Sequence, residues 1–433
     1  MRRQLLLAGF LSSGCVVTEP TSTDGPLESL PANVTMWREA APAFDSSVIS
    51  LRVKQSTTVR SLPSDRSAPL GVVAQDMRVN CHGAAESGPG CERWIEIEPR
   101  GYVCDRVLEP TRKEPYAFEL PRMDPGAIVP GIYGAPLRRF RSLSVLLKFR
   151  DEVKVKGRTY LRTVLGKMVD KRKVHLKEAS TFSGILLKSP QAPLLPLAWA
   201  QSRVSPRSPI AVWSDHEDGE LIGVLDPREP VPILGQSEDG LWARVAEGAW
   251  ISFDDLHVAR MVHPPEGVGA TDRWIDVDLA EQVLIAYEGK RPVFTTLVST
   301  GTAHPTPEGT YRVWIKFSEA DMQGNTGDHR YSVSSVPWTM YFHKDFALHA
   351  AYWHDGFGQA RSNGCVNLSP QDARRMYQWS SPEVPMGWSM AYATPETPGS
   401  LVQVRKSASN FNEPTPKKRV PTRGNSRVIA KSR

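Results

Sequence analysis

Proline and glycine are the residues that most constrain how this chain can fold. There are 36 prolines and 32 glycines among its 433 residues. Because proline interrupts helices and both residues favour turns, this frequency predicts short strands joined by turns. The hydrophobic content of 40% and the charged content of 23% are typical of globular proteins, which excludes a wholly disordered chain. A mostly β protein of about three domains is therefore predicted.

The net charge of +6 is concentrated at the C-terminal end. Residues 405–433 contain nine Lys or Arg and a single acid, Glu413, so the rest of the chain sums to −2. The folded part is therefore not a basic nucleic-acid-binding protein, and no nucleic-acid partner is expected. Residues 405–433 are predicted to be a basic disordered tail.

The first fifteen residues have the pattern of an export signal. Arg2 and Arg3 precede an apolar run at residues 5–11, and small residues then lead to Cys15. The segment resembles a bacterial lipoprotein signal (1–15), which would be cleaved before Cys15 and leave lipid on its thiol. Ser12 stands where that family prefers Leu, so ordinary signal cleavage is the alternative.

The residues after Cys15 predict where the protein works. Residues 16–47 are rich in Pro, Ser, Thr and Glu, which is typical of a flexible tether. Together with the signal, they predict an exported protein, periplasmic or at the cell envelope, that is anchored to the membrane by its N-terminal lipid. An apolar run of seven residues is too short for a membrane-spanning helix.

Three cysteines cluster in an otherwise cysteine-poor chain. Cys81, Cys91 and Cys104 lie within 24 positions, and export implies an oxidising compartment. Three thiols allow at most one disulfide within the cluster. Cys81–Cys91 would close a hairpin, and the pairings Cys91–Cys104 and Cys81–Cys104 stay open. His82 is the one histidine nearby and there is no paired CxxC, so neither a metal nor a cofactor is predicted.

Two segments share an order of short β-rich motifs. Residues 48–110 and residues 208–262 both end in a Trp strand, a tight turn, an aromatic strand and an acidic close. Both resemble the bacterial SH3-like domain, a small β-barrel. Between them, residues 111–207 are predicted to hold a partial β module, with a Lys/Arg-rich solvated face, and a Pro-rich linker. These modules are expected to position the protein, so a chain that starts near Val268 should keep its chemistry.

The C-terminal region, residues 268–395, is predicted to be a mostly β domain with one helix. Residues 274–279 alternate between apolar and polar, as a half-buried strand does. Ser369 precedes Pro370, and Asp372 follows at the third helical position, which is a strong helix start. This helix would begin just after Cys365.

Cys365 is the strongest candidate for a catalytic residue. A thiol becomes a good nucleophile when a base or cation is near, and His349 lies sixteen residues upstream at the end of a predicted strand. Gly364 would let the backbone approach a substrate carbonyl closely. The amides of Gly364 and Cys365 could then receive an oxyanion.

These residues carry a definite family resemblance. His349-Ala350 is followed by a loop and then by Ser362-Asn363-Gly364-Cys365-Val366-Asn367, while Thr306-Pro307-Glu308-Gly309 stands upstream. This order is similar to that of the L,D-transpeptidase (YkuD-type) catalytic domain family. The resemblance implies a C-terminal β-sandwich with one helix after the catalytic Cys, preceded by two SH3-like barrels or, with the partial module, three.

The resemblance also implies roles for single residues. Cys365 would be the nucleophile and His349 the general base, oriented by the carbonyl of Ala350. Ser362 and Asn367 would brace the cysteine loop. Trp353 and His354 would form a wall of the substrate cleft, and Tyr331 would supply an extra hydroxyl at the oxyanion. Asn363 departs from the family, which has His there, and could replace it by hydrogen bonding.

The implied function is a cysteine acyltransferase of the cell wall. It would form a thioester with a peptidoglycan stem peptide and transfer it to an amine, with stem peptides and glycan as partners. Two alternatives remain open from the sequence. The acyl group could pass to water, which makes a carboxypeptidase or hydrolase, or the chain could be a wall-binding lipoprotein without catalysis.

Overall fold

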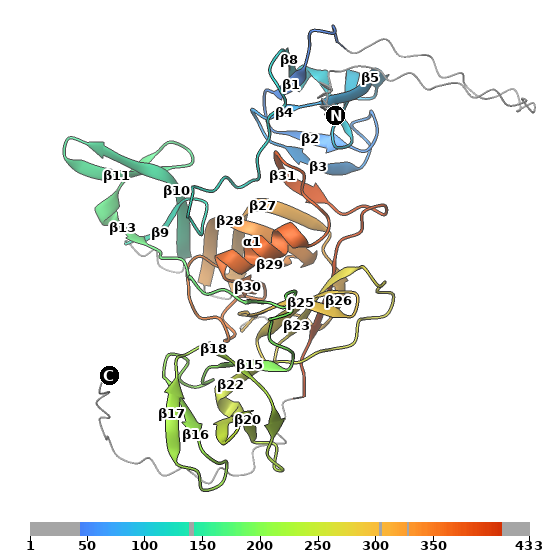
Figure 1. The fold of residues 1–433 in the computed structure, drawn as a ribbon. Helices are drawn as coiled ribbons and strands as arrows, with labels where there is room; N and C mark the ends of the chain where they lie inside the picture. The colour runs from blue at the N-terminus through green and yellow to red at the C-terminus, as the bar shows by residue number, and fades with distance from the viewer. Residues whose placement is uncertain (1–43, 138–142, 303–304, 327–328, 409–433) are drawn as a thin grey trace, which may run out of the picture.

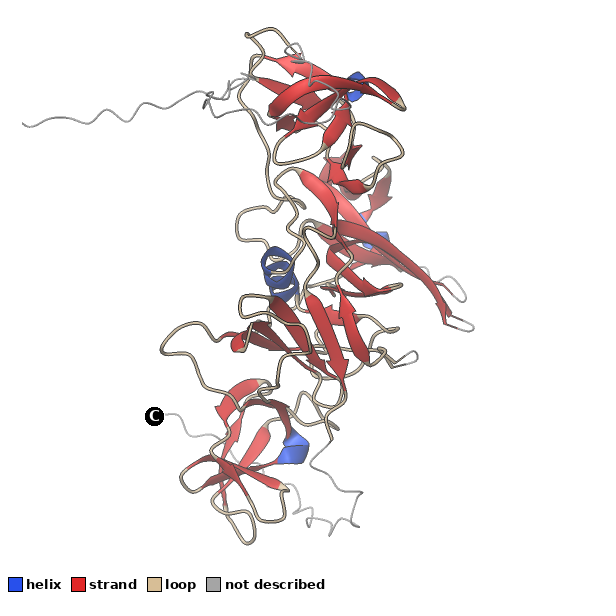
Figure 2. Ribbon diagram, turned by 90° about the vertical axis from the view of Figure 1, so that its right-hand side faces the viewer, coloured by secondary structure: helices blue, strands red, loops and turns tan. Residues whose placement is uncertain are grey.

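A computed structural model describes residues 44–137, 143–302, 305–326 and 329–408. Within these residues the chain is mostly β, as predicted, with 32 strands and one α-helix. Cys15, residues 16–43 of the predicted tether and residues 409–433 of the predicted tail lie outside the described residues. The molecule is elongated, with an N-terminal module and a second module at opposite ends and the C-terminal domain between them (Figures 1 and 2).

The N-terminal module packs one small sheet and the end of a larger sheet, which continues into the C-terminal domain, around one apolar core. The sheets have the orders β4-β1-β8 and β3-β2-β7-β6-β5. Their strands are β1 (Ser50–Val53), β2 (Thr57–Arg60), β3 (Pro69–Val73), β4 (Arg78–Val79), β5 (Cys81–Gly88), β6 (Cys91–Ile97), β7 (Tyr102–Cys104) and β8 (Leu108–Thr111), with a 3-10 turn at Asp105–Val107. Its likeness to an SH3 domain stays a prediction.

The disulfide of this module joins Cys91 to Cys104, with 5.9 Å between their Cα atoms. The Cys81–Cys91 hairpin closure is therefore wrong. In the β5–β6 hairpin, Cys81 pairs with Ile97, at the far end from Cys91. Strands β6 and β7 are antiparallel neighbours, and Trp94 pairs with Cys104, which brings the ends of the two strands together.

The insert is a five-stranded unit at residues 132–176. Its strands are β9 (Ile132–Pro136), β10 (Leu143–Val155), β11 (Arg158–Thr163), β12 (Met168–Asp170) and β13 (Val174–Leu176), with a 3-10 turn at Lys171–Lys173. Phe149, Leu161 and Val174 form its own small core. This unit corresponds to the predicted partial β module and projects to the left in Figure 1.

The second module begins earlier than predicted. Strand β15 (Leu197–Ala200) falls in the expected linker, yet all four of its residues are buried and it pairs with two strands of the module. Its short apolar run, Leu-Ala-Trp-Ala, lies in a segment rich in proline, and the segment therefore resembles a linker in the sequence. The other strands are β16 (Ile210–Trp213), β17 (Leu221–Leu225), β18 (Glu229–Pro232), β19 (Gly235–Gln236), β20 (Trp242–Ala246), β21 (Ala249–Ser252) and β22 (Leu256–Ala259), with a 3-10 turn at Phe253–Asp255.

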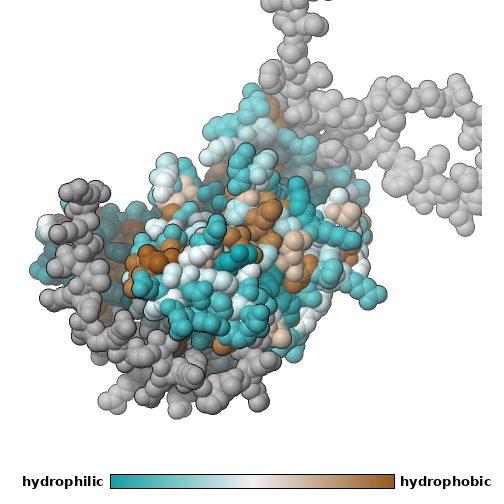
Figure 3. Space-filling model, turned by 60° about the horizontal axis from the view of Figure 1, so that its bottom comes forward, coloured by the Kyte–Doolittle hydropathy of each residue, from teal (hydrophilic) through white to brown (hydrophobic). Residues whose placement is uncertain are grey.

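The surface of the second module is mixed in character. Figure 3 shows apolar patches set among hydrophilic side chains on the face that the bottom of the molecule presents. On β17, the side chains of Leu221, Ile222 and Val224 are more than half exposed.

The C-terminal domain packs two sheets face to face. One sheet has the order β14-β25-β24-β23-β32-β26, and the other runs through β31, β27, β28, β29 and β30. The strands are β14 (Ile185–Leu186), β23 (Arg273–Asp278), β24 (Val283–Glu288), β25 (Arg291–Leu297), β26 (Gly309–Arg312), β27 (Ile315–Thr326), β28 (His329–His343), β29 (Phe346–Ala350), β30 (Val366–Leu368), β31 (Trp388–Tyr392) and β32 (Leu401–Arg405). Buried residues of both sheets share one core, which gives the predicted sandwich.

The domain extends past its predicted end at residue 395. Strand β32 pairs in parallel with β23 and antiparallel with β26, so it lies inside the first sheet. Arg405, which the charge pattern assigns to the tail, forms ion pairs with the buried carboxylates of Asp276 and Asp278. A lone cation at the end of a strand carries no sequence signal of such partners.

The single helix, α1 (Pro370–Trp379), has the predicted start. The hydroxyl of Ser369 accepts a hydrogen bond from the Asp372 amide, and Pro370 opens the first turn. Ala373, Met376 and Tyr377 are buried in the core of the domain. No helix within the described part of the chain is both long and apolar enough to cross a bilayer.

Candidate active site

Strand register brings His349 and Cys365 together. Strands β29 and β30 are parallel neighbours, and His349 pairs with Asn367. Cys365 directly precedes β30, two positions before Asn367. Because side chains alternate along a strand, Cys365 and Asn367 lie on the face that carries His349. The base and the nucleophile predicted from sequence are thus adjacent, although sixteen positions separate them in the chain.

A cavity of about 450 Å³ opens at this point. It contains most of the predicted site residues, namely Tyr331, His349, Trp353, Ser362, Asn363, Cys365 and Asn367. The other lining residues are Ser144 and Leu146 from β10, Met322 and Val333 from the β27–β28 hairpin, and Asp345, Phe346 and Arg361. One wall therefore comes from the insert, which sequence reasoning treats as a solvated face.

His349 is held in the tautomer that a base needs. Its Nδ1 lies 3.1 Å from the carbonyl oxygen of Ala350, as predicted. A carbonyl only accepts, so Nδ1 carries the proton and Nε2 keeps its lone pair. The side chain is 2% exposed, and burial lowers its pKa from 6.5 to about 4. His349 is therefore neutral at physiological pH.

Cys365 is a neutral thiol in this structure. Burial raises its pKa from 9.0 to about 11, while a backbone hydrogen bond from Ala347 acts in the opposite direction and nearby Asp345 adds a small further rise. Its Sγ lies 3.6 Å from the Asp345 carbonyl oxygen, within reach of a weak S–H hydrogen bond. A neutral thiol beside a neutral imidazole suits proton transfer during attack rather than a preformed ion pair.

The cysteine loop is braced by hydroxyl groups. Ser362 Oγ accepts from the Gly364 amide at 2.9 Å and donates to the Cys365 carbonyl at 2.5 Å. Thr306 Oγ1 donates to the Gly364 carbonyl at 2.6 Å. Gly364 has φ +130°, a conformation that favours glycine. The bracing position of Ser362 is as predicted, whereas Thr306 was not singled out, although its Thr-Pro-x-Gly turn was the available signal.

The Gly364 amide is a correction to the expected oxyanion site. It was predicted to donate to the oxyanion together with the Cys365 amide, but here it donates to Ser362 instead. The Ser362 hydroxyl, two residues earlier in the same turn, accepts the hydrogen bond of this amide. The Cys365 amide is the remaining member of the predicted pair.

Asn367 and His354 form one polar contact behind the cavity. Asn367 is 2% exposed, and its side-chain amide lies 3.0 Å from His354 Nε2. The Gly356 amide donates to the other ring nitrogen, Nδ1, at 3.1 Å. Both nitrogens of His354 are thus engaged within the loop, which makes it a loop support rather than a cleft wall. Trp353 does line the cavity, with its ring centroid 5.8 Å from that of His349.

Two tyrosines lie near the nucleophile. Burial raises the pKa of Tyr331, and electrostatic contributions from the neighbouring Cys365 and Asp345 add to the rise. Burial is also the largest cause that raises the pKa of Tyr341 to about 12, with contributions from Cys365, Asp345 and Tyr331. Tyr331 lines the cavity, and its role at the oxyanion stays a prediction. Tyr341 is an addition that no sequence motif marks. Asn363, the departure from the family pattern, is exposed at the cavity.

The loop between base and nucleophile is tied to the second module. The guanidinium of Arg228 donates to both carboxylate oxygens of Asp355, at 2.8 and 2.7 Å. Phe357 of the same loop is fully buried in a core that includes Leu197 and Trp199 of β15. The second module therefore helps to shape the wall of the site.

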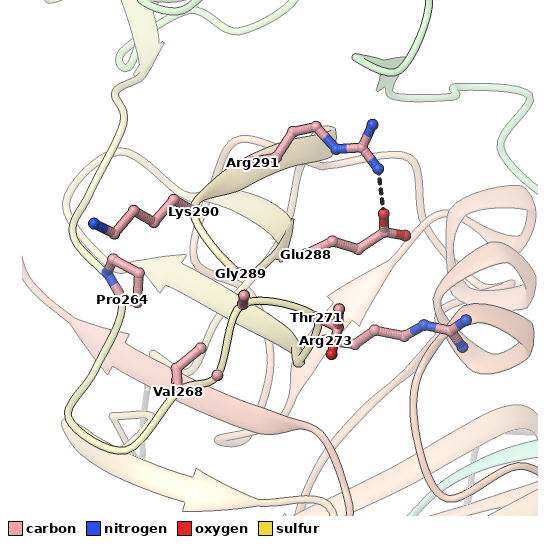
Figure 4. A pocket seen from close by; sticks show the side chains of 10 residues that line it. Pro264, Val268, Thr271, Arg273, Glu288, Gly289, Lys290 and Arg291 are labelled. Atoms are coloured by element: carbon pink, nitrogen blue, oxygen red, sulfur yellow. Dashed lines mark hydrogen bonds and ion pairs between the residues drawn. The ribbon is translucent and has the colours of Figure 1, made fainter.

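A larger cavity lies elsewhere on the C-terminal domain. It measures about 720 Å³ and lies at the turn between β24 and β25 (Figure 4). Glu288 at its edge is already paired with Arg291 and Lys188. Its lining includes neither a cysteine nor a histidine. The chemistry therefore points to the smaller cavity at Cys365.

The part of the chain that contains most of this cavity matches a known family. Residues 272–404 match YkuD, the L,D-transpeptidase catalytic domain family. This chain carries an L,D-transpeptidase catalytic domain. The match includes β23–β30, α1, β31 and nearly all of β32, and leaves the N-terminal module, the insert and the second module outside.

Solved L,D-transpeptidases are structurally similar at low identity. The catalytic domain from E. faecium is 24% identical with a TM-score of 0.25, covering 31% of this chain and 98% of that chain. L,D-transpeptidase 3 from Mycobacterium tuberculosis is 18% identical with a TM-score of 0.25, covering 31% and 61%. LdtMt1 in complex with imipenem is 16% identical with a TM-score of 0.26, covering 38% and 76%. Compared by sequence with curated proteins, the chain has no match.

The neutral pair in the L,D-transpeptidase domain predicts how thiol reactivity depends on pH. Because the thiolate is the reacting form and the pKa of Cys365 is about 11, alkylation by iodoacetamide should accelerate about tenfold per pH unit from about pH 7 to 10. His349, with a pKa of about 4, stays neutral throughout this range and adds no step. The rate is followed by mass spectrometry of the Cys365 peptide. A plateau below about pH 8 would indicate a thiolate–imidazolium pair instead.

Proposed function

We propose that this chain is an exported cysteine acyltransferase that forms a thioester with a peptidoglycan stem peptide and passes it to an amine. The observation that carries the proposal is the placement of His349 on β29 and of Cys365 directly before the parallel neighbouring strand β30, with both residues lining one cavity of an L,D-transpeptidase domain. The intact pair argues against a wall-binding lipoprotein without catalysis.

The reaction follows from the protonation states of the pair. Cys365 Sγ attacks the carbonyl carbon at the L-centre of the donor peptide, while His349 Nε2 takes the thiol proton. The C–N bond then breaks, and the imidazolium returns the proton to the departing amine of the terminal D-residue. The resulting thioester is attacked by the acceptor amine, whose proton passes through His349 back to the leaving thiolate.

Two features of the site support charge development during this attack. The Ala350 carbonyl accepts from Nδ1, which stabilises the imidazolium that forms when Nε2 is protonated. The Cys365 amide, supported by a phenol of Tyr331 or Tyr341, would donate to the tetrahedral oxyanion. One such donor is typically worth about 3 kcal/mol of barrier.

The test is product analysis with the full chain. The chain is incubated with a purified stem tetrapeptide, with and without an amine acceptor, and both intact protein and peptides are weighed by mass spectrometry. A thioester adduct on the protein and an acceptor-dependent cross-linked product are expected. Hydrolysed tripeptide alone would assign water as the acceptor, and neither adduct nor product would overturn the proposal.

Export and anchoring belong to the same proposal. The signal-like segment and Cys15 support a lipid-anchored protein at the cell envelope, because two or three acyl chains on one residue hold a protein stably in a membrane. The Cys15→Ala chain should therefore leave the membrane fraction for the soluble fraction, as read by immunoblot after fractionation. Retention in the membrane fraction would contradict lipidation at Cys15.

A further inference from the structure

The insert is a strongly basic unit within a stretch, residues 1–404, that is otherwise acidic. Residues 132–177 contain fourteen Lys or Arg against three Asp or Glu, a net charge of +11. Because residues 1–404 sum to −2, the remainder of that stretch carries −13. A charge so confined to one small unit is not needed for solubility and indicates an anionic partner.

The insert is fixed to the wall of the catalytic cavity. Strand β10 pairs in parallel with β28, with Ser144 opposite Tyr331, so the insert extends the sheet that carries His349. The ring of Tyr133 stacks on that of Tyr352 at 3.8 Å, and Lys148 forms an ion pair with Glu319 of β27. These contacts make the insert a continuation of the active site rather than a separate domain.

One face of the insert continues outward from the cavity. Ser144 and Leu146 line the cavity, whereas Phe149 and Leu161 are buried in the core on the opposite face. Alternation along β11 then places three side chains on the cavity side, namely Arg158, Tyr160 and Arg162. After a register shift in β10 between Phe149 and Asp151, Val153 pairs with Tyr160 and Val155 pairs with Arg158, so these β10 residues lie on the same face as their partners.

The cations of this face differ in their availability. Arg162 is already paired with Asp151. Arg158 is exposed and has no ion pair within the described residues. Tyr160 is half-buried between the two arginines. An arginine beside an aromatic ring on an open sheet face is suited to a carboxylate on an extended peptide.

We infer that this face of the insert binds carboxylates of the peptidoglycan polymer whose stem peptide occupies the Cys365 cavity. The inference rests on the proposed function, since the occupant of the cavity defines what reaches the insert. The bond is a charge-assisted contact from Arg158, with Tyr160 as a flat apolar neighbour. The insert thus acts as an extended substrate site, outside the family match at residues 272–404.

The experiment compares two charge reversals on one hairpin of the full chain. Arg158→Glu changes the cavity face, and Lys154→Glu changes the other face, where Lys154 pairs with Thr159 and is equally exposed. The KM for soluble wall fragments and the binding to purified sacculi are measured from about 50 to 300 mM NaCl. Arg158→Glu should raise KM roughly three- to tenfold and make binding to sacculi less dependent on salt. Arg158→Lys should keep most of the binding, and Lys154→Glu should behave as the wild type does.

Two further measurements separate the ways the inference can fail. Acylation by imipenem, a small probe that does not extend onto the insert, reports on Cys365 alone. Its absence in the wild-type chain refutes the proposed function, and its loss only in Arg158→Glu shows a distorted cavity and overturns the inference. Equal effects of Arg158→Glu and Lys154→Glu also overturn it. The inference is also overturned if binding to anionic lipid vesicles depends on Arg158 while binding to sacculi does not. This face would then bind a membrane rather than the cell wall.

Discussion

The Cys365→Ser chain should form no covalent adduct with a tetrapeptide donor or with imipenem. Serine keeps the shape of the site but replaces a thiol of pKa about 11 with a hydroxyl of far higher pKa, which the neutral imidazole of His349 cannot deprotonate efficiently. The acylation rate should fall by roughly 10³-fold or more. Intact-protein mass spectrometry over time measures this rate directly.

The control for this variant is the fold itself. Thermal unfolding of Cys365→Ser should match that of the wild type, because Ser362 and Thr306 brace the loop through its backbone and not through Sγ. An adduct that persists on Cys365→Ser would move the nucleophile elsewhere and defeat the assignment.

A chain that starts at Val268 should fail to fold as a stable domain. Trp274 and Tyr287 are fully buried against Leu197 and Trp199 of the second module, so truncation exposes this shared core. The cut also removes backbone and hydroxyl donors at Ser183 and Gly184 to the carboxylate of Asp372, which is 0% exposed.

A second buried carboxylate loses its partners in the same truncation. Glu281, 6% exposed, forms ion pairs with Arg203 and Arg260 and accepts from the Val258 amide. A hydrogen bond to a charged group typically contributes about 1.5–3 kcal/mol, and a whole domain has about 5–15 kcal/mol of stability. The loss of these bonds at both carboxylates, together with the exposed core, should exceed what the C-terminal domain retains.

The measurement compares residues 268–408 with residues 44–408 by circular dichroism during heating. The longer chain should unfold in a cooperative transition and the shorter one should show none. A soluble short chain with a cooperative transition and an unchanged rate of imipenem acylation would contradict the expectation. It would support the view from sequence alone that the upstream modules only position the enzyme.

The placement of His349 and Cys365 at one cavity could be predicted from sequence because its signals are local. Gly364 and Cys365 stand a few residues before a capped helix, with β30 between them, and four consecutive residues, Ser369–Asp372, mark the start of that helix. His349 ends a short apolar strand, so the pairing of β29 with β30 was the one long-range step required. The order of the motifs supplied that step through the family resemblance.

The contacts between modules could not be predicted because they depend on strand register and on single side chains. Strand β15 looks like linker because four residues between prolines carry little periodicity, and its burial depends on β18 and β22. The choice of Cys104 as partner for Cys91 depends on which strands are neighbours. Arg228 and Asp355, or Arg405 and Asp276, are charges far apart in the chain, and sequence alone offers no way to pair them.

The parallel pairing of β29 and β30 determines which changes in chain length the site can tolerate. Inserting one residue inside β29 would turn His349 to the opposite face, whereas the loop of residues 351–361 can change in length without moving either candidate catalytic residue out of register. In a catalytic domain of this kind without a second module, the length of this loop can therefore change and alter substrate specificity. In this chain Asp355 and Phe357 commit the loop to the second module, so its length and the shape of that module can only evolve together.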